Sequence, residues 1–189
     1  MEARRNHPAE PQPAPSRVTG EVGWENIPAA IRDASGMTAP SYADRFGIGV
    51  GERRGASAEA WARLILEGTP TGQSAPRLWR LLGLRLGPAG SPDHVQGWEI
   101  AHREGHWVRL ATASWAMSAR AVVWLDDAEV SLALFVHFDK LPAAVVWPPV
   151  AILHRRAVPV MLRQAVAPTS GPPSQCVATV PRRPPQSSS

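Results

Sequence analysis

The stretch EVSLALFVHFD, residues 129–139, decides the fold, because large apolar side chains occupy every second position in it. Alternate residues of a β-strand point to the same face of the sheet. The side chains that would share one face are Val130, Leu132, Leu134, Val136 and Phe138. The stretch therefore predicts a long strand with one face in the hydrophobic core.

Three segments upstream show the same alternation, and short turn sequences follow them. These segments are Trp98–Arg103, His106–Ser114 and Arg120–Leu125. Glu104-Gly105 and Asp126-Asp127 are typical of tight turns between antiparallel strands. Together with residues 129–139, the segments predict an antiparallel meander.

The residues before the meander predict one strand and two helices. Tyr42–Val50 is expected to be a first strand, with a short helical turn at Trp24–Ile31 leading into it. Ser57–Glu67 has a serine at its N-cap position and predicts the first helix. Ser74 is expected to cap a second helix over Pro76–Leu86.

The residues after the meander return to a helical period. Leu141–Trp147 predicts a helical turn that the Pro148-Pro149 pair interrupts, because proline lacks a backbone donor and restricts the residue before it. A terminal helix is expected over Val150–Val166, with Pro159 as a kink. This helix is the obvious cover for one face of the sheet, so the fold class is α+β.

The ends of the chain differ in composition from its centre. Residues 1–22 and 168–189 are rich in proline and serine and hold few large apolar groups, so we expect both to be disordered. Residues 23–167 are expected to form a single domain. The whole chain is 44% apolar and 19% charged, which is an ordinary globular composition.

Charge and cysteine content indicate which partners and compartment to expect. The net charge is +4, but acidic and basic residues alternate along the chain rather than gather into a basic face, which argues against nucleic-acid binding. The single cysteine, Cys176, allows no intrachain disulfide. The longest apolar run, Leu141–Leu153, is shorter than the roughly 20 residues that span a bilayer. We therefore expect a cytoplasmic protein with no integral membrane segment.

Several short motifs carry a resemblance to a bacterial domain-of-unknown-function family. They are SYADRF (41–46), AEAWA (58–62), LGLR (82–85), GW (97–98), VHFDKL (136–141) and PPVAILHRRAVPVMLR (148–163). The order of elements also resembles the helix-grip fold of the START and polyketide-cyclase-like (SRPBCC) superfamily. That resemblance implies a curved antiparallel sheet wrapped around the C-terminal helix.

The resemblance further implies a small apolar ligand between the sheet and the C-terminal helix. The residues expected to line its site are Trp61, Leu64, Leu110, Trp124, Leu134, Val136, Leu153 and Met161. A domain of this kind is expected to bind its ligand without a cofactor.

A second hypothesis is a cyclase- or hydrolase-type enzyme. His137 and Asp139 are two residues apart on the last predicted strand and would share a face, so they are the catalytic candidates. The competing interpretation is a surface ion pair or a strand-end cap. His154, with Arg155 and Arg156, would mark either an anion site or a solvated helix face.

Two further motifs bear on metal binding and on contacts with a protein or membrane. His102 and His106 have the spacing of metal ligands on a helix, but they lie in strand-period sequence and are expected to flank a hairpin turn, so no metal is predicted. The apolar segment Leu141–Val150 allows a third hypothesis, a protein-interaction or peripheral-membrane module.

Overall fold

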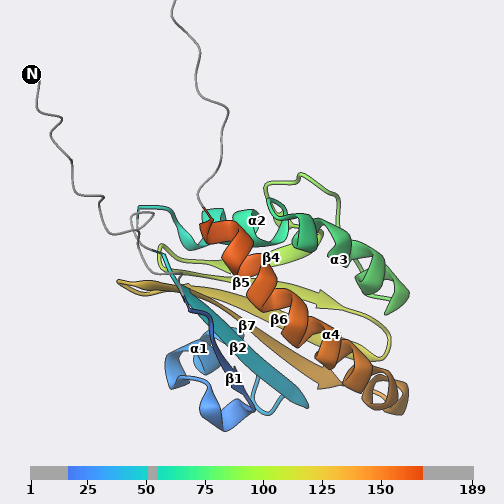
Figure 1. The fold of residues 1–189 in the computed structure, drawn as a ribbon. Coiled ribbons are helices and arrows are strands. Elements are labelled where there is room, and N and C mark those ends of the chain that lie inside the picture. The colour runs from blue at the N-terminus through green and yellow to red at the C-terminus, as the bar shows by residue number, and fades with distance from the viewer. Residues whose placement is uncertain (1–16, 51–54, 168–189) are drawn as a thin grey trace, which may run out of the picture.

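The computed structural model describes residues 17–50 and 55–167, which form one antiparallel sheet with helices on both faces (Figure 1). The class is α+β, as predicted. In spatial order the described strands are β1-β2-β7-β6-β5-β4-β3, and each neighbouring pair is antiparallel. Their bounds are β1 (Thr19–Val22), β2 (Tyr42–Gly49), β3 (His94–Val95), β4 (Trp98–Arg103), β5 (Trp107–Ala113), β6 (Met117–Leu125) and β7 (Glu129–Phe138).

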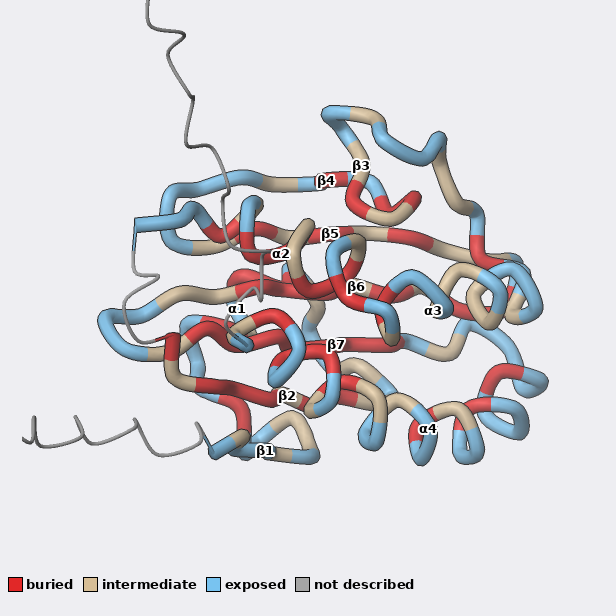
Figure 2. Tube along the Cα trace, turned by 45° about the horizontal axis from the view of Figure 1, so that its top comes forward, coloured by how far each residue is buried: buried red, intermediate tan, exposed pale blue. Residues whose placement is uncertain are grey.

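The helices divide between the two faces of this sheet. Helices α2 (Ala58–Leu66), α3 (Pro70–Leu81) and α4 (Leu141–Val166) lie on one face, and α4 crosses the strands diagonally (Figure 1). The short η1 (Trp24–Asn26) and α1 (Ala29–Ser35) pack on the other face. Covering both faces explains why β7 is buried throughout Val130–Val136 and not only at alternate residues (Figure 2).

The predicted meander is confirmed as β4 to β7, and the predicted first strand is β2. The expectation of disorder over residues 1–22 is wrong for Thr19–Val22, which pair with β2 as an edge strand. Backbone hydrogen bonds hold such a strand, so its composition gives little sign of it. The two-residue β3 was also missed. Residues 1–16 and 168–189 lie outside the described residues.

The first helix was predicted correctly and the second was not. Ser57 caps α2 by accepting the amide of Ala60 at 3.2 Å. In contrast, α3 begins at Pro70 and not near Pro76, because the Thr69 hydroxyl accepts the amide of Gly72 at 3.0 Å and supplies the N-cap. The helix ends at Leu81 rather than Leu86, and the chain then extends beside β5.

Pro76 lies inside α3 without breaking it. A proline removes the hydrogen bond to the carbonyl four residues earlier, which here belongs to Gly72. The side-chain amide of Gln96, just beyond β3, donates to this carbonyl at 2.9 Å. A side chain from outside the helix thus replaces the missing backbone donor.

The predicted break in the C-terminal helix is wrong, because α4 is continuous through Pro148 and Pro149. The carbonyls that lose their partners belong to Ala144 and Val145, and both residues are exposed. Water can therefore hydrogen-bond to them. A single long helix consequently lies on the sheet, and its middle turns contribute to the site described next.

Candidate functional site

A pocket of about 280 Å³ lies between the sheet and helices α3 and α4. Its lining residues come from the end of α2, from α3 and the residues after it, from β4, β6 and β7, and from α4. They are Leu66, Thr71, Ser74, Ala75, Leu78, Trp79, Leu82, Leu84, Trp98, Met117, Ala119, Ala121, Leu132, Leu134, Trp147, Val150, Leu153, His154, Ala157 and Met161. All but Thr71, Ser74 and His154 are apolar or aromatic, so the wall suits an apolar ligand.

The floor of the pocket is made by small side chains on the central strand. Ala119 and Ala121 of β6 point to the same face as their partners on β7, Val136 and Leu134. Protein cores are normally packed to high density, and a branched side chain would ordinarily fill such central positions. Two alanines in succession on this face leave room between the sheet and α4.

The structure brings three of the predicted ligand-site residues into this wall: Leu134, Leu153 and Met161. The remaining five do not line it. Trp61, Leu110 and Val136 are fully packed in the core on this face of the sheet, and Leu64 packs at its margin.

Trp124 lies on the opposite face of the sheet, so it cannot contact a ligand in the pocket. On β6 its side chain points to the face away from Ala119 and Ala121, and its cross-strand partner is Ser131. Its ring stacks on that of Trp107, with the two ring centroids 6.3 Å apart. The sequence suggested a core position, and Trp124 does pack beside α1, but in the smaller cluster on the far face.

One polar cluster lies beside the apolar wall of the pocket. Asp44 of β2 has a carboxylate with no exposed surface, and its Oδ1 lies 3.2 Å from Nε2 of His154 on α4. The hydroxyl of Tyr42 donates to Oδ2 of the same carboxylate. Strand periodicity puts Tyr42 and Asp44 on one face, and α4 brings His154 to it from 110 positions away in the sequence.

Burial and the adjacent Asp44 carboxylate raise the pKa of Tyr42 well above its usual range. The phenol therefore keeps its proton and remains a donor to Asp44. Its ring also packs edge-on against Trp147, with centroids 5.2 Å apart, which fixes it beside the pocket.

Two aromatic donors near the pocket lack acceptors. The indole Nε1 atoms of Trp98 and Trp147 are buried, and neither makes a hydrogen bond within the described part of the chain. Both residues contribute to the pocket wall. An unpaired buried donor costs free energy, so the aromatic side of the wall is not optimised for stability alone.

The pair proposed for catalysis from the sequence lies elsewhere. His137 and Asp139 are on and just after the end of β7, with Nε2 and Oδ1 4.0 Å apart and both side chains about half exposed. Neither lines the pocket. This geometry is that of a loose surface pair.

The two histidines with metal-like spacing flank the β4–β5 turn, as predicted. His102 stacks on Trp107 with ring centroids 4.4 Å apart, and His106 meets Trp124 edge-on. Within residues 17–50 and 55–167, no group of three or more metal-ligating side chains is found.

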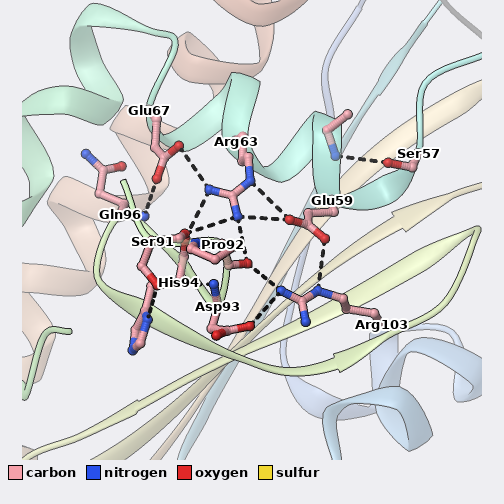
Figure 3. Close-up of polar contacts among 11 residues, drawn as sticks. Ser57, Glu59, Arg63, Glu67, Ser91, Pro92, Asp93, His94, Gln96 and Arg103 are labelled. Carbon is pink, nitrogen blue, oxygen red and sulfur yellow. Dashed lines mark hydrogen bonds and ion pairs between the residues drawn. The ribbon is translucent and has the colours of Figure 1, made fainter. Parts of the chain in front are cut away.

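A separate polar network anchors the loop before β3 to α2 (Figure 3). Arg63 donates to the carbonyls of Pro92 and His94 and to the carboxylate of Glu59. Glu59 also accepts from Arg103 on β4 at 3.0 Å. Burial alone would raise the pKa of Glu59, but hydrogen bonds from the two arginines outweigh it and the pKa is lowered. The network is structural, and it holds the segment that carries Gln96.

Comparisons of the chain with models of protein families, with curated proteins and with solved structures found no match. No helix in the described ranges is long and apolar enough to cross a bilayer. A functional assignment must therefore come from the pocket and the residues around it.

Proposed function

We propose that this domain binds a small apolar ligand in the pocket between the sheet and helices α3 and α4. The observation that carries the proposal is the wall itself, apolar at all but three positions, around a hollow of about 280 Å³. That volume is close to the lower end of the range of about 300–1,000 Å³ for small-molecule sites. The ligand class is therefore a short acyl chain or a compact aromatic molecule.

Two features of the sequence agree with this proposal. The resemblance to the helix-grip superfamily implies a ligand in this position, between a curved sheet and the C-terminal helix. The lone cysteine favours a reducing, cytoplasmic setting for such a binder.

The hollow is also difficult to explain as a feature of a purely structural domain. Empty apolar volume destabilises mutant cores by roughly 24 cal/mol for each Å³. A ligand that fills the pocket would supply the contacts that Ala119 and Ala121 leave out. It would bind the folded state alone and so raise the melting temperature.

The proposal is tested by screening medium-chain fatty acids, medium-chain alcohols and two-ring aromatics against the full chain. Trp79, Trp98 and Trp147 line the pocket, so tryptophan fluorescence reports on occupancy, and a thermal shift reports on linkage. We expect at least one class to change the fluorescence and to raise the melting temperature in a saturable manner. If none does, the binding function is wrong.

A second candidate, a peripheral-membrane function, is favoured by a specific surface. Leu81, Trp115, Leu141 and Val145 are between 60% and 83% exposed. Leu81 and Trp115 border one shallow hollow with the first turns of α4, and the ammonium of Lys140 lies 5.5 Å above the Trp115 ring. Exposed apolar side chains beside a tryptophan and a lysine are typical of surfaces that rest on a bilayer.

Liposome co-sedimentation of the wild type and of a Leu141→Ser/Val145→Ser variant tests this surface. The two residues are exposed, so the variant should fold normally. We expect the wild type to co-sediment with vesicles that contain anionic lipid and the variant to lose most of that binding. Equal sedimentation of both proteins would remove the membrane function. Trp147 is unsuitable for this test because it is buried.

A further inference from the structure

We propose that His154, which hydrogen-bonds to Asp44, is the polar anchor of the pocket and selects ligands that carry a hydrogen-bond donor, such as an alcohol or a phenol, on an apolar body. This inference rests on the proposed binding function and makes it more specific. Among the pocket-lining residues that the structure describes, His154 is the one ionisable side chain. Its side chain is 21% exposed, so it is neither sealed in the core nor free in solvent.

The neighbouring groups determine which nitrogen of His154 carries the proton. A carboxylate can only accept hydrogen bonds, and Asp44 is fully buried, so both of its contacts must donate to it. Tyr42 donates through its hydroxyl to Oδ2. Nε2 of His154, 3.2 Å from Oδ1, must then carry a hydrogen.

A neutral imidazole protonated at Nε2 has a lone pair at Nδ1. No residue in the described part of the chain hydrogen-bonds to Nδ1, and His154 is one of the residues that line the pocket. Tyr42 and Asp44 are thus positioning residues, which fix the tautomer and the ring orientation. Nδ1 is left to accept a proton donor from a ligand.

Two other polar side chains, Ser74 in the wall and Arg155 next to His154, fit this role less well. The Ser74 hydroxyl donates to the carbonyl of Thr71 within α3. Arg155 follows His154, is exposed and does not line the pocket. The buried carboxylate on β2 would be costly to keep in an apolar core without a purpose, because removing charges from water carries a large penalty. Orienting a pocket histidine is such a purpose.

Three matched aromatic probes separate this inference from the general binding function. Naphthalene has no polar group, 2-naphthol adds a donor, and 2-methoxynaphthalene has the same oxygen without a proton. We expect isothermal titration to show 2-naphthol binding about tenfold more tightly than 2-methoxynaphthalene, as one hydrogen bond would give. In His154→Phe this preference should vanish while naphthalene still binds.

Each alternative result is decisive. If 2-naphthol and 2-methoxynaphthalene bind equally to the wild type, the anchor is wrong and the apolar pocket stands. If 2-naphthoate binds more tightly than 2-naphthol, His154 is an imidazolium that binds anions, and the donor-selective anchor is again wrong. If no probe binds, the binding function fails with it. Should His154→Phe not fold, His154→Gln, which keeps an acceptor oxygen, must retain part of the preference.

Discussion

Nε2 of His154 lies 3.2 Å from Oδ1 of Asp44, a carboxylate without exposed surface, and this contact joins α4 to β2. Apart from this pair and the Tyr42 hydroxyl on the same carboxylate, the residues of α4 and the sheet that line the pocket are apolar or aromatic. Apolar packing is not directional, whereas a hydrogen bond to a buried carboxylate requires one alignment. The pair therefore fixes how α4 lies over the hollow.

Replacing Asp44 should be costly. Asp44→Ala leaves the Tyr42 hydroxyl and the His154 ring without their acceptor in a buried place, so we expect the free energy of unfolding to fall by about 2–4 kcal/mol. Urea denaturation measures the change. Asp139→Ala, in the half-exposed pair with His137, is the matched control and should change stability by less than about 0.5 kcal/mol. Similar losses in both variants would mean that the buried pair does not hold α4.

The titration of Tyr42 can be followed alone, because the chain contains one tyrosine. Burial first, and then Asp44, raise its pKa, so the folded state holds the phenolic proton more tightly than the unfolded state. The stability that the protonated Tyr42 contributes is fully present below the unfolded pKa of about 10 and is lost as the pH rises above that value. Tyrosinate absorbance should appear near pH 10 in urea and only with unfolding in buffer. Ionisation near pH 10 in the folded protein would refute the buried contact with Asp44.

The contribution of Glu59 to stability should depend on pH in the opposite sense to that of Tyr42. Its pKa is lowered in the folded protein from an ordinary value of 4.5, so its contribution is present above that value and is lost as the pH falls through the folded pKa. Between pH 5 and pH 3, by ordinary linkage, the wild type should lose more stability than Glu59→Gln. Glu99→Gln, at an exposed position of β4, should behave as the wild type does. Parallel acid profiles for wild type and Glu59→Gln would contradict the arginine network of Figure 3.

The link between Gln96 and Pro76 predicts a coupled pair of substitutions. Gln96→Ala removes the donor to the Gly72 carbonyl and should cost about 1 kcal/mol. In a Pro76→Ala background the new amide of residue 76 can take that carbonyl, so the same substitution should cost less. A double-mutant cycle by urea denaturation measures this coupling. Additive effects would show that the two residues act independently.

The fold was predictable where a periodic pattern spans a whole element. The alternation over residues 98–139 gave the meander, and Ser57 marked the start of α2. Thr69-Pro70 is as good a helix start as Ser74, so the sequence alone does not locate the start of α3. The prolines of α4 predict a break because the sequence does not tell which carbonyls face water.

The site was less predictable, for two physical reasons. Asp44 and His154 are far apart in the sequence, and only the tertiary fold brings them together. The second reason concerns volume, since the predicted lining residues all have large side chains. The hollow instead comes from small ones, and the sequence signal for it is the pair Ala119 and Ala121 at alternate positions of a central strand.

The most direct test of the central claim is to fill the hollow from its floor. Ala121→Ile adds branched volume at the pocket, and Ala101→Ile makes the same exchange at an exposed position of β4. Isothermal titration with naphthalene should give equal affinity for the wild type and Ala101→Ile, and an affinity at least roughly tenfold weaker for Ala121→Ile with no lower melting temperature. Unchanged binding of naphthalene by Ala121→Ile would place the ligand elsewhere and contradict the account.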